Sequence, residues 1–367
     1  MYIFFDTNIF YKHWHAKNAD FNLFFNYIEN SRSTLLVSDL VCEEIENGHD
    51  REFKVVLDKL KSELIKANNF NEERIEYDFE KLNQPYSFKG ILEERVKLSR
   101  LKYISYDDVK QSEVVTRAVK ILRPFQEDDK GYRDTLIWLS FLYYIKENKI
   151  KGEIAFINNN KGDFYSADDK TIDFHPGLKK DIERIVGDSK IIPYESLSSF
   201  IAHKIVKEEN QFTRDEVYEK YLDSIDRIIE GESEFFINDL SASDFSEVLV
   251  ENSWRSFAPL NNIIRHNFKI DEGVEDPEVL GFKVISKDLI YINYRYNLRR
   301  CTLYITISRA EYLASQSEFD RNFDVEAGSR GEVTFAIYVR TYLDASFNYN
   351  ISENNIEGFT IENIEFK

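Results

Sequence analysis

Hydrophobic and polar residues follow one pattern before about residue 206 and another after it. In the first part, short unbroken apolar runs are separated by longer segments whose apolar residues recur every three or four positions. The short runs are typical of strands buried on both faces of a sheet, and the longer period is typical of helices. The pattern predicts strands at 2–5, 34–40, 153–157 and 190–194, and helices at 21–30, 51–123, 131–149, 177–186 and 196–208.

Strands that alternate with helices favour an α/β fold, with a parallel sheet covered by helices on both faces. After a charged segment at about 205–235, the pattern changes to alternation with a period of two, as in LIYINYRYNLRRCTLYITIS. Such runs are typical of an antiparallel sheet with one wet face. We therefore expect two domains: residues 1–205, with a helical insertion at about 51–125, and an α+β domain at 206–367 whose sheet is mostly antiparallel.

Composition narrows the class of protein. The 367 residues are 43% hydrophobic, 31% charged and 15% aromatic, which is ordinary for a globular protein with ample core. No stretch approaches the roughly 18 apolar residues needed to cross a bilayer. The first residues carry an acid where a signal peptide carries positive charge, so we expect a cytoplasmic protein without a membrane partner. Its two cysteines match no metal spacing, and its histidines form no zinc pattern.

The net charge of -18 is unevenly spread. Residues 1–205 hold 35 acidic and 31 basic side chains, a net of -4, whereas residues 206–367 hold 31 and 17, a net of -14. The second part is therefore a poor candidate for binding a polyanion. The first part can still present basic residues around a local acidic cluster.

Four acidic residues stand where predicted strands end or predicted helices begin. They are Asp6 after the first strand, Glu44 at the start of the next helix, Asp134 in GYRDTLIW, and Asp163 just beyond the strand at 153–157. Each alone is compatible with a helix cap or a first-turn acid. In a parallel sheet, however, such positions meet at one edge, where carboxylates repel and a cation relieves the repulsion. Oxygen ligands of this kind suit Mg²⁺ or Mn²⁺.

The ordered motifs FFDTNIF, LVCEEI, YRDTLIW and FINNNKGDF resemble those of the PIN-domain nucleases, and FHPGLKKDIE resembles the larger bacterial PIN-like proteins that carry a second domain. The resemblance covers about residues 1–200. It implies a nuclease that uses one or two Mg²⁺ or Mn²⁺ ions to hydrolyse phosphodiester bonds, with RNA favoured over single-stranded DNA. The resemblance further implies that the protein is an endoribonuclease that acts as a toxin or a phage-defence effector.

Carried over residue by residue, the acidic constellation of the family falls on Asp6, Glu44, Asp134 and Asp163, as catalytic residues and metal ligands. Glu44 is preferred to Glu43 because it directly precedes an aliphatic residue. Many PIN domains have Ser or Thr and then an acid directly after the fourth strand, whereas this chain has asparagines there and its acid follows at position 163. The resemblance implies four residues that orient the ligands or a bound water: Thr7, Asn8, Asn158 and Asn160.

Substrate contacts are expected from basic residues near these acids, namely Arg133, Lys130, Lys161 and Lys12, with Lys170 as a weaker candidate. Arg133 equally suits a surface ion pair with Asp128 or Asp129. Three aromatic residues, Tyr11, Trp14 and Tyr132, are placed to stack on unpaired bases, although such residues more often pack in a core.

Two other functions are compatible with parts of the sequence. A phosphatase of the haloacid dehalogenase type also begins with a strand that ends in Asp, but it needs a second Asp two residues later, where this chain has Asn8. The stronger alternative is a PIN-like fold that serves as a non-catalytic binding or assembly module. For residues 206–367 we expect a partner protein or a homo-oligomer, bound in part through an edge strand; the alternative is a β domain that only braces the nuclease.

Overall fold

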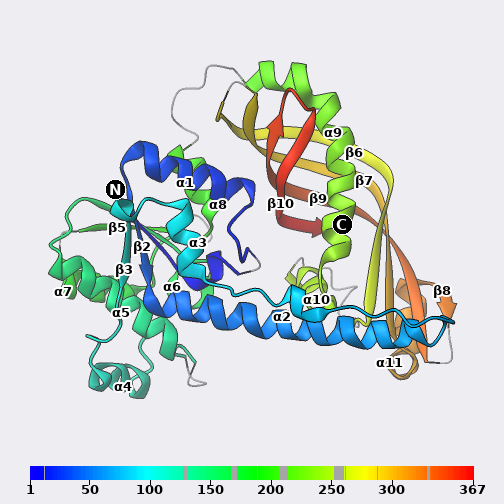
Figure 1. The fold of residues 1–367 in the computed structure, drawn as a ribbon, viewed down its shortest axis with the longest axis horizontal. Coiled ribbons are helices and arrows are strands. Elements are labelled where there is room, and N and C mark those ends of the chain that lie inside the picture. Colours follow the sequence, from blue (N-terminus) through cyan, green and yellow to red (C-terminus); the bar gives the residue numbers. More distant parts are fainter. Residues whose placement is uncertain are drawn as a thin grey trace. The chain divides into compact units, whose positions relative to one another are not determined.

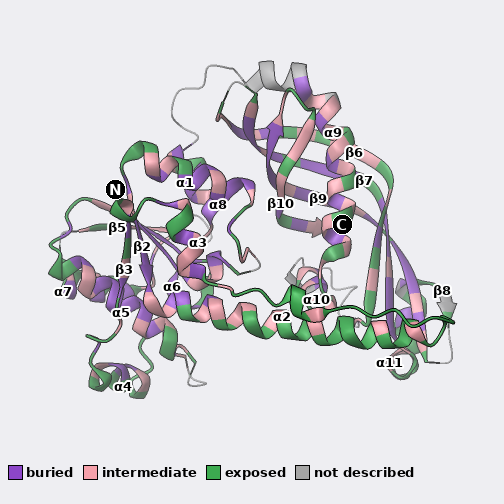
Figure 2. Ribbon diagram, viewed as in Figure 1, coloured by how far each residue is buried: buried purple, intermediate pink, exposed green. Residues whose placement is uncertain are grey.

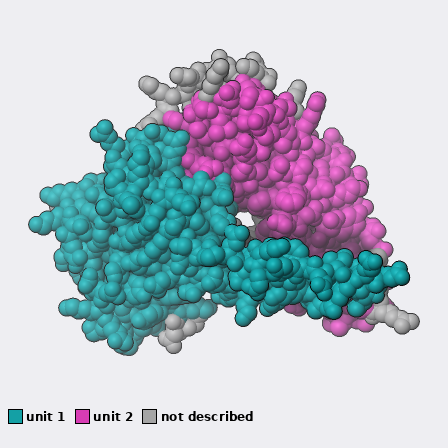
Figure 3. All heavy atoms as spheres, in the orientation of Figure 1, with its two compact units in different colours: residues 1–17, 24–205 teal, residues 18–23, 206–367 magenta. Residues whose placement is uncertain are grey.

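The computed structural model describes residues 1–11, 13–126, 130–166, 172–187, 189–205, 214–251, 260, 262–286, 288–328 and 331–367. Contacts within the chain divide it into two compact units, distinguished by colour in Figure 3. The first unit contains residues 1–17 and 24–205, and the second contains residues 18–23 and 206–367. Each unit is built around a sheet of its own (Figure 1).

The first unit contains a five-stranded sheet in which every neighbouring pair of strands is parallel, in the order β3-β2-β1-β4-β5. The expected parallel sheet is therefore confirmed. Its strands are β1 (Tyr2–Phe5), β2 (Thr34–Ser38), β3 (Leu101–Ile104), β4 (Glu153–Ile157) and β5 (Lys190–Tyr194). Its helices include α1 (Ala19–Ser31), α2 (Asp39–Asn68), α3 (Phe88–Arg95), α4 (Gln111–Val119), α5 (Tyr132–Glu147), α6 (Lys161–Phe164), α7 (Pro176–Ile185) and α8 (Leu197–Phe200), with short helical turns η1 (Thr7–Ile9), η2 (Phe79–Leu82), η3 (Leu98–Arg100) and η4 (Ile201–Ile205).

Helices cover both faces of this sheet. Successive side chains of β1 point to opposite faces, so Phe4 and Phe5 pack against different helices. The ring of Phe5 contacts Phe24 of α1 at a centroid distance of 4.6 Å, and the ring of Phe4 contacts Phe141 of α5, also at 4.6 Å. Phe4 and Phe5 are completely buried. Figure 2 shows β2 in the colour of buried residues; β1 and β4 are equally buried, whereas β5 is mostly intermediate. The unbroken apolar run at the start of the chain is thus explained by burial on both sides.

The prediction of a helical insertion at about 51–125 is wrong at two places. Residues 69–87 contain no α-helix, only the short turn η2. The segment LKYI forms the edge strand β3, which pairs with β2, and α2 runs without a break from Asp39 to Asn68. Alternating charged and apolar residues around LKYI imitate a helical period, and four residues are too few for periodicity to separate strand from helix.

Strand order fixes where a site can form. The chain passes from β1 to β2 and β3 on one side, and returns to place β4 and β5 on the other side of β1. In sheets of this kind, ligands bind outside the carboxyl ends of the strands where the order reverses, here between β1 and β4. Asp6 directly follows β1 at this place, and its backbone N–H donates to the carbonyl of Ile157 at 3.1 Å.

The second unit contains an antiparallel sheet in the order β10-β9-β7-β6, with β8 also paired to β9. The predicted antiparallel sheet is confirmed. Its strands are β6 (Arg265–Val284), β7 (Leu289–Ser308), β8 (Asp324–Gly328), β9 (Glu332–Asn350) and β10 (Asn355–Phe366), and its helices are α9 (Arg214–Asp239), α10 (Ala242–Glu251), α11 (Arg309–Ala314) and α12 (Gln316–Asn322). The apolar face of the sheet packs against Ile225 and Ile229 of α9 and Phe245 of α10.

The edge of β6 is closed by side chains of α9. Asn238 forms a pair of hydrogen bonds with the backbone of Phe268, and Glu234 and Glu230 accept from the backbone N–H groups of Ile270 and Val274 at 3.2 and 3.0 Å. The three side chains are four residues apart on α9, so they form one row along the strand. The expectation of an edge open to a partner strand is therefore wrong for β6.

Residues 18–23, at the start of α1, belong to the second unit by their contacts. The hydroxyl of Tyr291 donates to the buried carboxylate of Asp20 at 2.8 Å, and burial raises the pKa of Asp20. Gly358 has φ +66°, and a Cβ atom there would lie 2.7 Å from the backbone nitrogen of Ala19. A residue without a side chain is needed at this position.

Within the described residues, no helix is both long enough and apolar enough to cross a membrane.

Candidate active site

Three of the predicted acids line one pocket of the first unit. The pocket has a volume of about 660 Å³, and its walls include Asp6, Glu44 and Asp134. Asp6 follows β1, Glu44 lies in the second turn of α2, and Asp134 lies in the first turn of α5. The structure thus brings together residues that are up to 128 positions apart, at the carboxyl ends of the strands.

Asp6 is buried, with 3% of its surface exposed, and it does not act as a helix cap. It occupies the residue before η1, but its side chain makes no capping hydrogen bond. One carboxylate oxygen, Oδ2, accepts from the amide of Asn8 at 3.2 Å. The other, Oδ1, is buried without a hydrogen-bond partner in the described part of the chain. A buried carboxylate oxygen left without a partner is costly, which favours an atom held in place for a ligand.

Mutual repulsion and burial perturb this carboxylate strongly. Burial, followed by the neighbouring carboxylate of Asp134, raises the pKa of Asp6 from 3.8 to about 8. Burial also raises the pKa of Asp134 to about 6, with further contributions from Asp163 and Glu44. Both shifts mean that the negative charges of the cluster are under-compensated by the protein itself.

Glu44 is held by two residues of the same site. The Thr7 hydroxyl donates to Glu44 Oε2 at 2.5 Å, and Arg133 Nη1 lies 2.7 Å from Glu44 Oε1. Arg133 itself is largely exposed, with 71% of its side chain accessible, so the pair adds little stability but directs both groups to the pocket. Arg133 also lines the pocket.

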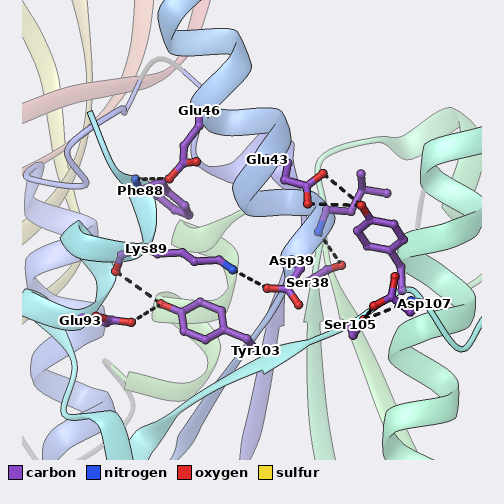
Figure 4. Close-up of polar contacts among 12 residues, drawn as sticks. Ser38, Asp39, Glu43, Glu46, Phe88, Lys89, Glu93, Tyr103, Ser105 and Asp107 are labelled. Atoms are coloured by element: carbon purple, nitrogen blue, oxygen red, sulfur yellow. Dashed lines mark hydrogen bonds and ion pairs between the residues drawn. The ribbon is translucent and has the colours of Figure 1, made fainter. Parts of the chain in front are cut away.

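The other acids near the start of α2 are engaged elsewhere (Figure 4). Asp39 forms an ion pair of 2.6 Å with Lys89, and Glu46 accepts from the backbone N–H of Phe88 at 2.8 Å. Glu43, which also lines the pocket, accepts from the Tyr106 hydroxyl at 3.2 Å. Figure 4 shows these acids directed toward the segment 88–107. Glu44, in contrast, contacts the pocket residues Thr7 and Arg133.

Asparagines join the ends of β1 and β4 beneath the pocket. The Asn8 amide donates to Asn158 Oδ1 at 2.9 Å, while its own oxygen accepts from the backbone N–H of Asn159 at 3.0 Å. Asn158 is buried, and its Oδ1 also accepts from the backbone N–H of Asn160 at 2.6 Å. Asn8 therefore positions Asp6 on one side and the 158–160 turn on the other, as expected of a residue that orients a ligand.

Asp163 does not line this pocket. Its carboxylate accepts from the amide of Asn160 at 2.6 Å, pairs with Arg123 at 3.1 Å, and accepts from the amide of Gln126. Together, these three hydrogen-bond donors occupy both carboxylate oxygens of Asp163. Asn160 does line the pocket, so Asp163 reaches the site through Asn160 and through its charge, which acts on Asp134.

The segment before α5 is shaped to bring Asp134 into place. Gly131 has φ +98°, and a Cβ atom there would lie 2.5 Å from the carbonyl oxygen of Pro124, which excludes any other residue without a shift of the backbone. Arg123 and Gln126 of the same segment hold Asp163. The residues of this segment thus contact one predicted acid and precede another, a role that the sequence did not predict for Arg123 and Gln126.

The predicted basic residues divide into three groups. Arg133 lines the pocket; Lys161 forms an ion pair with Glu195 at 2.8 Å, and Lys130 is exposed, and neither of these two contributes to its walls. Lys12, Lys170 and the suggested partners Asp128 and Asp129 lie outside the described residues. Sequence reasoning missed Asn47 and Arg51, which line the pocket. Their spacing of three and seven residues from Glu44 places them on the same face of α2 and was the available signal.

The donor set fits a divalent cation. Hard cations prefer carboxylate oxygens, and the pocket offers those of Asp6, Glu43, Glu44 and Asp134; one oxygen of Asp6 has no hydrogen-bond partner in the described part of the chain. Among the residues that the structure describes, no group of three or more His, Cys, Asp or Glu side chains is arranged so that it could hold a metal ion by itself. An open site, in which one or two carboxylates and several waters hold the ion, is the arrangement that Mg²⁺ usually adopts.

A parallel sheet with an acidic pocket at its carboxyl edge defines the first unit as an α/β domain. Residues 3–164 match the family model of the PIN domain, which supports a PIN-domain protein with a further C-terminal region. Proteins of this family are generally nucleases that act on nucleic acid and use divalent metals. Neither the curated proteins nor the solved structures contain a match to this chain.

Proposed function

We propose that the PIN domain is a Mg²⁺- or Mn²⁺-dependent nuclease that hydrolyses phosphodiester bonds, and that RNA is its preferred substrate. The observation that carries the proposal is the carboxylate pocket, in which Asp6 is buried with one unpartnered oxygen beside Asp134 and Glu44. Such an arrangement is unfavourable unless a cation completes it. The preference for RNA over single-stranded DNA follows the family and not a particular residue of the pocket.

Asp6, Glu44 and Asp134 would hold the ion, which would lower the pKa of a bound water and relieve charge on the phosphoryl oxygens. Thr7 and Asn8 keep Glu44 and Asp6 in position through their hydrogen bonds. Arg133 is charged and largely exposed at the rim, where its unused donors suit a phosphate oxygen. We assign Asp163 to positioning, because its oxygens are already occupied.

Metal dependence is the direct test. Purified protein incubated with labelled RNA should cleave it in Mg²⁺ or Mn²⁺ and should stop when EDTA is added, because the carboxylates alone supply no electrophile. Single-stranded DNA of the same sequence, tested in parallel, should be cut more slowly. Cleavage that continues in EDTA, with metal loss verified by mass spectrometry, would exclude this mechanism. Calorimetry without any Mn²⁺ binding would instead favour a PIN-like module that only binds its partner.

For residues 206–367 we extend the proposal to binding of a protein partner or a second copy of the chain. The net charge of -14 opposes nucleic acid, and the closed edge of β6 directs contacts to the remaining surfaces of the unit. Light scattering of the intact chain should show a mass above that of one 43.5-kDa chain if the unit self-associates. A monomer at all concentrations would overturn self-association.

We further propose that the protein is located in the cytoplasm and that it acts as a toxin or defence effector.

A further inference from the structure

The pocket contains a second group of residues whose chemistry differs from that of the acids. Two aromatic residues, Tyr11 and Trp14, lie on its wall together with Asn47 and Arg51 of α2. Tyr11 is 43% exposed, which is a large fraction for a tyrosine that lines a pocket. Neither the metal site nor the hydrolysis described above uses these four residues.

The aromatic part of this wall is fixed before any ligand arrives. The ring of Trp14 lies over Gly48 of α2, 3.4 Å from the point where a Cβ atom would stand, and the backbone carbonyl of Trp14 accepts from the Tyr86 hydroxyl at 2.6 Å. Behind it, the rings of His49 and Tyr86 stack at a centroid distance of 3.7 Å. Rings that are already immobile lose little entropy when a ligand stacks on them.

Tyr11 completes the aromatic surface. Its ring packs edge-on against Trp14, with a centroid distance of 5.5 Å and an interplanar angle of 71°, and its hydroxyl donates to Glu52 of α2. The hydrogen bond and the edge contact hold the ring, and 43% of the residue remains exposed. Aromatic faces held in this way are the usual stacking surfaces for unpaired bases.

The polar part of the wall is not used by the protein. Within the described residues, Asn47 and Arg51 make no hydrogen bond or ion pair, in contrast to Arg133, which is paired with Glu44. An arginine offers five donors in a planar fork that matches a phosphate, and an asparagine amide can donate to and accept from the edge of a base. Together with the aromatic rings, these residues offer contacts to the base and to the phosphate of a nucleotide.

We propose that Tyr11, Trp14, Asn47 and Arg51 form a subsite for one unpaired nucleotide next to the phosphodiester bond that the acidic residues cut. This inference rests on the proposed nuclease function, which it deepens by naming the groups that select the substrate. A pocket of about 660 Å³ lies within the range that holds a small ligand. A base in a duplex is stacked on its neighbours, so the subsite selects a flexible strand, and it favours a purine because the larger base offers more surface for stacking.

The test is binding of a short labelled RNA in EDTA, where cleavage is absent, measured by fluorescence anisotropy. In a set of otherwise identical oligonucleotides, each position in turn lacks its base. With the wild-type protein, one position should weaken binding by about tenfold when its base is removed, because stacking on an aromatic ring is lost there. In Tyr11→Ala, the intact RNA should bind about tenfold more weakly and the dependence on that position should largely disappear.

Two variants control for unrelated effects. Tyr11→Phe keeps the ring and loses the bond to Glu52, so it should bind nearly as well as the wild type. Tyr77→Ala removes another exposed tyrosine, accessible to 49%, which does not line the pocket, and it should leave binding unchanged. A set of base-free oligonucleotides that all bind alike, or a Tyr77→Ala variant that loses as much affinity as Tyr11→Ala, would overturn the subsite.

The two proposals fail in different ways. If RNA is cut in Mn²⁺ but removal of a base never changes binding, the subsite is wrong and the nuclease stands. If one base controls binding but no metal supports cleavage, the nuclease is wrong although the nucleotide site exists.

Discussion

Replacing Asp6 with asparagine is expected to lower the rate of cleavage by on the order of a thousandfold, because it removes the most deeply buried carboxylate of the proposed metal site. The amide has the same shape and can still accept from Asn8, so the hydrogen bonds that join the ends of β1 and β4 should persist. Initial rates with labelled RNA in saturating Mn²⁺ measure the effect. Unchanged rates in this variant would remove Asp6 from the mechanism.

The same substitution should make the metal-free protein more stable at high pH. With a folded-state pKa of about 8 and an ordinary value of 3.8, Asp6 keeps a proton in the folded protein that the unfolded chain has already released. The wild type therefore loses stability as pH rises from about 4 to about 8, by up to about 1.4 kcal/mol for each pH unit. Asp6→Asn cannot lose a proton, so its stability should be nearly independent of this group.

Urea unfolding in EDTA at several pH values between 4 and 9 tests this expectation. The free energies of unfolding of wild type and Asp6→Asn should be similar near pH 4 and diverge in favour of the variant toward pH 8. Added Mn²⁺ should raise the stability of the wild type, since a ligand that binds only the folded state stabilises it, and should affect the variant much less. A variant that is less stable than the wild type at every pH would indicate a structural role for the carboxylate.

The positions of Asp6, Glu44 and Asp134 were predictable because each lies beside a strong local signal. An unbroken apolar run ends at Asp6, a second one ends just before the helix that carries Glu44, and Asp134 lies in the first turn of a helix with a largely buried middle. Strand order then brings them together by a general rule for parallel sheets. The resemblance to PIN domains rests on the same local motifs and is confirmed over residues 3–164.

What the sequence did not reveal depends on contacts between distant residues. Asp163 lies close to its motif position, but Arg123 and Gln126, 40 and 37 residues earlier in the chain, occupy its oxygens. Lys161 also lies just after β4, but it forms an ion pair with Glu195 and does not line the pocket. Such pairings are decided by tertiary structure, and charge alone at a given position carries no information about them.

The division of the chain into two units could also be predicted only in part from the sequence. The change of pattern near residue 206 is visible in the sequence, whereas the contacts of residues 18–23 with the second unit are not. These contacts join Asp20 to Tyr291, 271 residues later, and require a glycine at position 358. No local pattern distinguishes this helix start from any other, because an acid in the first turn is common for reasons of the helix dipole alone.

The two adjacent glutamates at the start of α2 provide a matched pair for the second large effect. Glu44 is bonded to Thr7 and Arg133 at the pocket, and its charge contributes to the raised pKa values of Asp6 and Asp134. Glu43 is exposed and bonded to the hydroxyl of Tyr106. Both line the pocket, and both substitutions replace one glutamate by one glutamine on the same helix turn.

Glu44→Gln is expected to lower cleavage by about a hundredfold or more, because it withdraws a carboxylate from the metal and frees Arg133 from its ion pair. Glu43→Gln should change the rate by less than about threefold, since the amide oxygen still accepts from Tyr106 and an exposed charge is well screened. Rates over a range of Mn²⁺ concentrations separate lost affinity, which excess metal restores, from lost chemistry, which it does not. Equal losses in both variants would show that general negative charge at this end of α2 is what matters, and a loss confined to Glu43→Gln would transfer the role of ligand to that residue.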